Sequence, residues 1–210
     1  MWPLLACSVL GLAIIAERGY YFFRLRLNYE TFRSGLFGLL AKRKIREAAG
    51  LCREHPNPVP RLAGRYLKNL RNDTLRNEIL KREGSLALEK IETRLRPLAV
   101  LTHLAPLLGL LGTVMGLVSA FHQIELLGGE VQAGDLAAGI WEALITTVYG
   151  LLIAIPCMAA YHGFEGEADR VARRMQFVVS ELDEFFGKHS VKDFRTEDIE
   201  ATEEALKAVS

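Results

Sequence analysis

The chain has 210 residues, of which 50% are apolar and 24% are charged, and its 26 basic residues nearly balance its 25 acidic ones. That composition would suit a soluble globular protein, but residues 97–121 contain no Asp, Glu, Lys or Arg, and 136–161 contain only Glu142. About 20 predominantly apolar residues are enough to cross the hydrocarbon core of a bilayer. The charge distribution therefore excludes a soluble single-core protein and most nucleic-acid-binding functions, and predicts a polytopic membrane protein.

The first expected element is a transmembrane helix over residues 1–23. Its uncharged part, 2–16, would rise only about 22 Å as a helix, but it continues into an aromatic cluster at 20–23 of the kind that anchors at a membrane interface. Glu17 and Arg18, which are opposite in sign, fall near its end. A cleaved signal peptide is the alternative, which the lack of a basic start and of a small-x-small cleavage site disfavours.

A cytoplasmic helical loop is expected next, over 24–96. It contains 18 Lys and Arg residues against 8 Asp and Glu residues. Three prolines between 55 and 60 predict a break between two helical parts, because no helix interior tolerates such a cluster. Apolar residues recur at spacings of 3, 4 and 3 from Leu88 to Leu98, so we expect the second part to run into the next span, with a kink at Pro97.

Residues 97–121 and 136–162 are expected to form the second and third transmembrane helices, joined by a short periplasmic loop, 122–135. This loop has three acidic residues and no Lys or Arg, whereas the loop at 24–96 is strongly basic. Lys and Arg residues near the membrane ends mark the cytoplasmic side. The pattern therefore predicts a periplasmic N-terminus and a cytoplasmic C-terminus.

The cytoplasmic segment, 163–210, is predicted to begin as a continuation of the third span. We expect one helix from about Leu136 to Phe186, about 75 Å long. Its apolar residues recur at alternating spacings of 4 and 3, which predicts a seam packed against another helix, either within the chain or in a second copy. After Gly187 the sequence is acidic, and we expect a mobile end. The seam consists of Phe164, Ala168, Val171, Met175, Val178, Leu182 and Phe185.

Glu142 is the first candidate functional residue. An ionisable group inside a span costs about 2.5–3.5 kcal/mol on insertion scales, which favours a functional role over a carboxylate that only reaches outward to water. Thr146 and Tyr149 fall on the same stripe of an ideal helix, where the three groups could carry a proton or hold water. Thr147 lies about 140° from Glu142. A threonine hydroxyl in a membrane helix more often bonds to a backbone carbonyl than performs chemistry.

The second span contains a smooth face of small residues. Gly112 and Gly116 form a small-xxx-small pair that allows close helix packing, and Gly109 lies one turn earlier. Thr113 lies within this face, either buried at a helix contact or exposed to a narrow polar path. In the third span Pro156 frees a backbone carbonyl, and we include it among the packing residues.

Soluble-enzyme signatures are not found in the sequence. The Gly-rich stretch at 109–116 is followed by no Lys and lies in no βαβ unit. The three cysteines form no CxxC motif. We therefore expect no catalytic residues, no cofactor and no metal site, with a membrane enzyme using Glu142 or His103 as a weak alternative.

Two motifs in the predicted hairpin point to a family. They are APLLGLLGTVMG at 105–116 and GIWEALITTVYGLLIAIP at 139–156. Together with the three-span layout, they resemble the MotA/TolQ/ExbB proton channel family, and the three spans favour the ExbB/TolQ branch over the flagellar stators, which usually have a fourth. The likeness is strong over 97–161 and elsewhere rests on layout. It places the family's pore threonines on Thr113 and Thr147.

The resemblance also implies an assembly in the bacterial inner membrane. A homo-oligomer, expected to be a pentamer embedded in membrane lipid, would surround helices of an ExbD/TolR-like single-span protein that carries a membrane aspartate. Proton flow would drive work on a TonB/TolA-like protein for outer-membrane transport or envelope maintenance, with no nucleic acid involved. The alternative is a non-conducting oligomeric scaffold that stabilises a single-span partner. Because the sequence begins almost at the first span, functions of an outer N-terminal extension are not expected.

Overall fold

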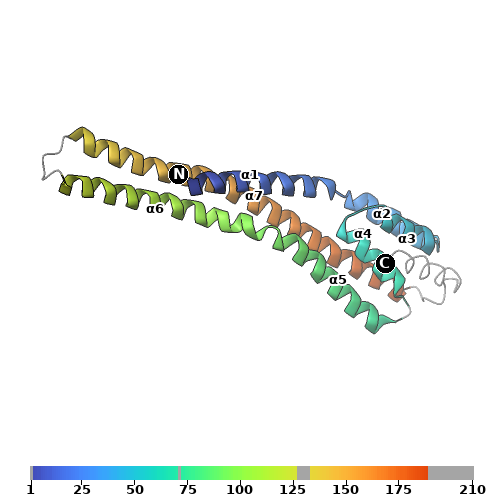
Figure 1. The fold of residues 1–210 in the computed structure, drawn as a ribbon. Helices are drawn as coiled ribbons and strands as arrows, with labels where there is room; N and C mark the ends of the chain where they lie inside the picture. Colours follow the sequence, from blue (N-terminus) through green and yellow to red (C-terminus); the bar gives the residue numbers. More distant parts are fainter. Residues whose placement is uncertain (1, 71, 127–132, 189–210) are drawn as a thin grey trace. The chain divides into compact units, whose positions relative to one another are not determined.

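The computed structural model describes residues 2–70, 72–126 and 133–188 (Figure 1). These residues are helical apart from short connections, which confirms the predicted all-α class. Three helical segments, containing α1, α6 and α7, are long and apolar enough to cross a membrane. The helices are α1 (Trp2–Arg24), α2 (Tyr29–Ala41), α3 (Ile45–Arg53), α4 (Pro58–Lys68), α5 (Asp73–Thr93), α6 (Arg96–Leu126) and α7 (Ala133–Lys188).

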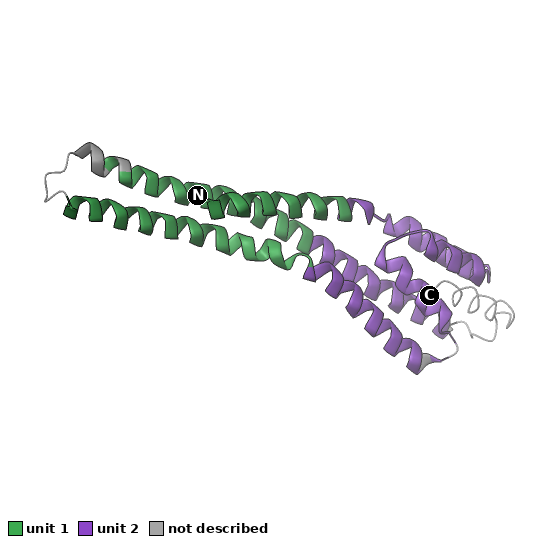
Figure 2. Ribbon diagram, in the orientation of Figure 1, with its two compact units in different colours: residues 1–21, 94–165 green, residues 22–93, 166–210 purple. Residues whose placement is uncertain are grey.

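The chain divides into two compact units (Figure 2). Unit 1 comprises residues 1–21 and 94–165, and so contains most of α1, all of α6 and the first part of α7. Unit 2 comprises 22–93 and 166–210, and so contains α2 to α5 and the last part of α7. The single long helix predicted from 136 to 186 is confirmed, because α7 runs unbroken from Ala133 to Lys188 and contributes to both units.

The core of unit 1 forms where α1 packs against α6 and α7. Leu98, Leu101 and Cys157 are buried there, and apolar side chains of α1 cover them. Gly11 permits this approach, since a Cβ at that position would lie 2.8 Å from the sulfur of Cys157 and 3.6 Å from Leu101 Cδ1. A larger residue at position 11 would therefore push α1 away from its partners.

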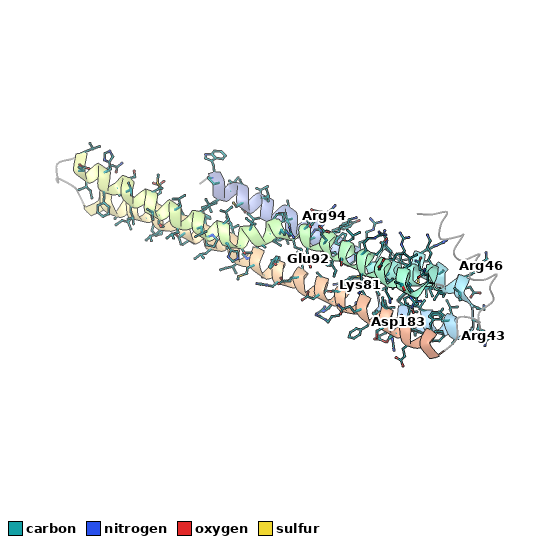
Figure 3. All side chains as sticks on the ribbon, turned by 90° about the horizontal axis from the view of Figure 1, so that it is seen from below. Arg43, Arg46, Lys81, Glu92, Arg94 and Asp183 are labelled. Atoms are coloured by element: carbon teal, nitrogen blue, oxygen red, sulfur yellow. The ribbon has the colours of Figure 1, made fainter. Side chains whose placement is uncertain are left out.

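A cluster of charged residues lies at the end of unit 1 where α5 gives way to α6. The guanidinium of Arg18, only 1% exposed, donates to Glu17 at 2.7 Å and lies 4.6 Å from the centre of the Tyr21 ring. Arg94, labelled in Figure 3, donates to the same carboxylate at 3.3 Å. A buried charge is costly unless it is paired, so Glu17 and the tyrosine ring offset part of the cost of burying Arg18.

The sequence predicted a kink at Pro97, but the structure has a break between two helices just before this proline. α5 ends at Thr93, and Arg94 and Leu95 form a turn before α6 begins at Arg96. Proline has no N–H to donate to the carbonyl of Thr93, four residues earlier, but it fits readily in the first turn of a new helix. The two helices are therefore separate elements, although Leu95 and Leu98 are both buried as the pattern predicts.

In unit 2 the predicted proline break separates α3 from α4. Asn57 caps α4: its side-chain oxygen accepts from the N–H of Val59 at 2.9 Å, and its amide donates to the carbonyl of Leu25 at 2.7 Å. Pro58 occupies the first turn of α4, where its missing N–H costs nothing. The same asparagine therefore starts α4 and ties it to the segment that follows α1.

The predicted seam of α7 is buried within the chain, which confirms the intrachain bundle. Ala168, Val171, Met175, Val178 and Leu182 are all buried. At the end of the seam the prediction is wrong by one residue, since Phe186 is buried and Phe185 is half-buried.

Contacts across unit 2 explain this shift. The Phe185 ring centre lies 6.0 Å from that of Phe37 on α2, while the Phe186 ring stacks on Tyr66 of α4 at 5.9 Å. The hydroxyl of Tyr66 also donates to Asp183, labelled in Figure 3, at 2.7 Å. The two adjacent rings of α7 therefore pack against different helices, Phe185 against α2 and Phe186 against α4.

Two predicted segments fall partly or wholly outside the described residues. The expected periplasmic loop, 122–135, overlaps the ends of α6 and α7, and its middle part, 127–132, is not described. The expected mobile end lies beyond Lys188 and is likewise not described.

Candidate functional site

The closest helix contact in unit 1 runs between α6 and α7, which are antiparallel. A Cβ on Gly116 would lie 2.8 Å from the Cβ of Ala143, and one on Gly112 would lie 2.5 Å from the hydroxyl oxygen of Thr146. A Cβ on Gly150 would lie 2.7 Å from the carbonyl oxygen of Ala105. Ordinary carbon–carbon contacts are about 3.5–4.0 Å, so the two backbones approach this closely only because the glycines have no side chains.

The missing side chain of Gly109 opens its carbonyl to α7. Thr147 donates its hydroxyl to this carbonyl oxygen at 3.2 Å. The hydroxyl of Thr146 lies 3.1 Å from the same oxygen and 2.7 Å from the carbonyl of Ala143 on its own helix. Two consecutive threonines of α7 therefore meet one backbone carbonyl of α6.

Thr113 is placed differently from these two threonines. It is half-buried, and its hydroxyl donates to the carbonyl of Leu110 on its own helix at 2.7 Å. In the described part of the chain it makes no hydrogen bond to α7. The structure thus brings together Thr146 and Thr147, but not Thr113.

Glu142 and Tyr149 lie on the exposed side of α7. Glu142 is exposed and Tyr149 is 44% exposed, and within residues 2–70, 72–126 and 133–188 neither has a hydrogen-bond or ion-pair partner. Thr146, predicted to share their stripe, faces α6 instead. Pro156 lies inside α7 and is exposed, whereas the neighbouring Cys157 is buried.

Sequence reasoning missed the half of the contact that α7 contributes. Gly139, Ala143 and Gly150 all face α6, and a Cβ on Gly139 would lie 2.9 Å from the Cβ of Ala120. These residues are 4 and 7 positions apart, so they lie on one face of a helix, as the glycines of α6 do. A search for small residues at helical spacing along both spans would have found them. The structure also corrects the emphasis on α6 alone, because both helices supply small residues.

A second polar group lies at the end of unit 1, beyond the predicted third span. Glu165 interacts with His162 Nδ1 at 3.1 Å and accepts a hydrogen bond from the Tyr161 hydroxyl at 2.9 Å. The contact with His162, and then that with Tyr161, lowers the pKa of this carboxyl below its ordinary value. The carboxylate therefore stays ionised to a lower pH than a free glutamate does.

Thiols and carboxylates do not gather into a metal site in the described ranges. Groups of three or more His, Cys, Asp or Glu residues with suitable geometry are not found there. The three cysteines are free. Burial raises the pKa of Cys52, in α3, to about 12, so its thiol stays protonated at neutral pH.

Comparison with known proteins identifies the fold family. A model of the MotA/TolQ/ExbB proton channel family matches residues 55–177, which include the whole α6–α7 contact and Glu142. The chain belongs to the MotA/TolQ/ExbB proton channel family. The resemblance seen in the two hairpin motifs is thus confirmed.

Relatives narrow the assignment to the ExbB/TolQ branch. The chain is 27% identical to the biopolymer transport protein exbB1 of Vibrio cholerae over 85% of its own length and 80% of that protein. It is 35% identical to an ExbB-like biopolymer transport protein of Synechocystis over 74% of its length, but covers only 62% of that protein. It is 36% identical to the Tol-Pal system protein TolQ of Pseudomonas aeruginosa over 41% of its length and 37% of that protein. This ExbB/TolQ-family chain is therefore a multi-pass membrane protein of a channel family.

Proposed function

We propose that this chain is the proton-conducting subunit of an ExbB/ExbD- or TolQ/TolR-like motor in the bacterial inner membrane. The observation that carries the proposal is the exposure of Glu142 on an otherwise apolar stretch of α7, with no partner in the described chain. An ionisable side chain facing lipid there would cost about 2.5–3.5 kcal/mol. A pore or the helix of another protein removes that cost, so we assign the face that carries Glu142 and Tyr149 to a shared pathway.

The proposed assembly supplies the other side of that pathway. Several copies of the chain, five in the proposal, surround the helices of an ExbD/TolR-like single-span protein that carries a membrane aspartate. Protons pass this aspartate, Glu142 and the threonines at positions 113, 146 and 147. The names of the relatives, which include biopolymer transport proteins and a Tol-Pal system protein, support this class of assembly.

The tight α6–α7 contact suits a pathway that must not leak. Small residues in direct backbone contact leave little room for water between the two helices, so the proposed path runs along faces that carry polar groups, to which the half-buried Thr146 and Thr147 remain partly open. Each elementary charge crossing 100 mV releases about 2.3 kcal/mol. The proposed motor uses that energy to act on a TonB/TolA-like protein, in outer-membrane transport or envelope maintenance. In this proposal the N-terminus of the chain is periplasmic and its C-terminus is cytoplasmic.

Proton flux in reconstituted vesicles tests this proposal. The chain is co-purified with its single-span partner, and flux is measured for wild type, Glu142→Gln and Thr147→Ala. We expect both variants to assemble and to lose flux. Thr102→Ala is the matched control, because Thr102 is buried and its hydroxyl donates within α6, to the carbonyl of Ala99 at 2.7 Å. Unchanged flux in Thr147→Ala or Glu142→Gln would refute the assignment.

The non-conducting scaffold is a second candidate, and one observation favours it. The hydroxyls of Thr113, Thr146 and Thr147 all donate to backbone carbonyls, as packing residues do. In that case the wild-type complex conducts no protons, and Glu142→Gln supports cell growth as well as wild type. The scaffold function would be selected if wild type and Glu142→Gln both co-purify with the single-span partner and neither complex conducts protons.

A further inference from the structure

A cavity of about 390 Å³ opens in unit 2, between the start of α2 and the outer side of α7. It has an aromatic character and one fixed positive charge. Its lining residues are Leu27, Asn28, Tyr29, Glu30, Arg174 and Phe177.

The positive charge of the cavity, on Arg174, is not neutralised by the described chain. Its guanidinium carbon lies 5.5 Å from the centre of the Tyr29 ring, and it forms no ion pair with any described residue. The nearby carboxylate of Glu181 is already held by Arg33, whose Nε lies 2.7 and 2.8 Å from its two oxygens. Glu30, the one acidic residue in the lining, is 80% exposed and lies 4.0 Å from the same Arg33. Arg174 is therefore available to an external carboxylate.

Tyr29 adds a hydrogen-bond donor to the same place. Its hydroxyl is shielded from solvent and has no partner among the described residues. Burial, and then the charge of Glu181, raise the pKa of this hydroxyl, so it remains a donor at neutral pH. A buried hydroxyl without a partner is costly, which indicates that an acceptor belongs nearby.

Phe177 supplies an uncovered apolar surface at the rim. It is 59% exposed, although its neighbour Val178 is completely buried. A guanidinium, a hydroxyl donor and an open aromatic ring together fit a peptide that carries carboxylates next to apolar side chains. A free inorganic anion would leave the aromatic ring uncovered.

The chain itself contains a segment of this chemistry. Residues 189–210 follow directly on α7 and contain six Asp and Glu residues against three Lys and Arg residues, with Phe194 and Ile199 among the acidic ones. Arg174 lies about 21 Å back along α7 from Lys188. A chain of this length can span about 70 Å when extended, so it reaches the cavity easily. We propose that the acidic segment 193–204 docks on its own chain at Arg174, Tyr29 and Phe177.

Hydrogen exchange on the full-length protein in lipid nanodiscs tests this proposal. We expect the backbone amides of 193–204 to exchange about tenfold more slowly in wild type than in Arg174→Glu, a factor that corresponds to about 1.4 kcal/mol. Arg170→Glu is the matched control, because Arg170 is exposed on the same helix and is already paired with Glu167. The control should keep the protection, and excess synthetic peptide 189–210 should remove it from wild type by competition.

Two further variants separate docking from a general effect of charge. Tyr29→Phe removes only the hydroxyl, and Phe177→Ser changes only an exposed ring, so each should lower the protection several-fold without altering the far-ultraviolet circular dichroism. Equal loss in Arg170→Glu and Arg174→Glu, or no protection in wild type, would overturn the proposal. Protection of residues 27–30 and 174–177 that requires phosphatidylglycerol in the nanodisc, with 193–204 unprotected, would instead assign the cavity to the membrane surface.

Discussion

Gly150→Ala is the most direct test of the α6–α7 contact. The new Cβ would lie 2.7 Å from the carbonyl oxygen of Ala105 and 3.1 Å from the Cα of Gly109. Both are backbone atoms, which no change of side-chain rotamer can move. Since carbon–carbon contacts are normally about 3.5–4.0 Å, the two helices must separate by about 0.5–1 Å. That separation also lengthens the hydrogen bond from Thr147 to Gly109.

The size of the effect follows from two opposing terms. Inserting a methyl group into a well-packed contact costs about 1–3 kcal/mol, while alanine favours a helix over glycine by about 1 kcal/mol. Gly163→Ala isolates the second term, because Gly163 lies in the same helix and a Cβ there would meet nothing within 4 Å. The difference between the two variants should therefore be about 1–3 kcal/mol, or about 5- to 150-fold in the unfolding equilibrium.

Reversible unfolding in detergent, followed by tryptophan fluorescence, measures this difference. The signal comes from Trp141, which lies on α7 two residues before Ala143, and from Trp2 on α1. We expect Gly150→Ala to unfold at lower denaturant than Gly163→Ala and to lose proton flux more severely. If the two variants were equally stable, the close approach of the two backbones at Gly150 would be wrong.

Two further predictions concern groups outside the spans. In a variant whose only cysteine is Cys52, maleimide at pH 8 should leave the native protein unlabelled, because burial raises the pKa of this thiol to about 12. Denaturation should allow labelling, and rapid labelling of the native protein would contradict the burial of Cys52. Because His162 and Tyr161 lower the pKa of Glu165, this carboxylate stabilises the fold above its ordinary pKa of about 4.3, and the contribution disappears as the pH falls through the lower folded value. Glu165→Gln should therefore flatten the fall in melting temperature on acidification while Glu167→Gln does not, and superimposable curves for wild type and Glu165→Gln would refute the coupling.

Most of the fold could be predicted from the sequence because it depends on hydropathy and helical period. The apolar stretches at 97–121 and 136–161 and the proline break before Pro58 are local properties of the chain. The seam of α7 was predicted correctly from Ala168 to Leu182 because a buried stripe must repeat every 3.6 residues. Its end at Phe186 could not be predicted, since that position depends on which rings the other helices of unit 2 present.

The candidate site was harder to predict for a geometric reason. Helical spacing correctly relates Glu142, Thr146 and Tyr149 by angle, but angle alone does not say on which side of the stripe the neighbouring helix lies. The structure places α6 against Thr146 and Thr147, so the line of contact divides the stripe and leaves Glu142 and Tyr149 exposed. The partner helix, and not the spacing, decides which polar groups are free.

The backbone contact between α6 and α7 has a mechanical consequence. Small residues follow the contact on both helices, as where Gly116 meets Ala143, and larger residues such as Met115 and Leu117 flank them, so turning either helix about its own axis would set a bulky side chain against backbone. The two helices therefore resist turning relative to each other and form one stiff pair.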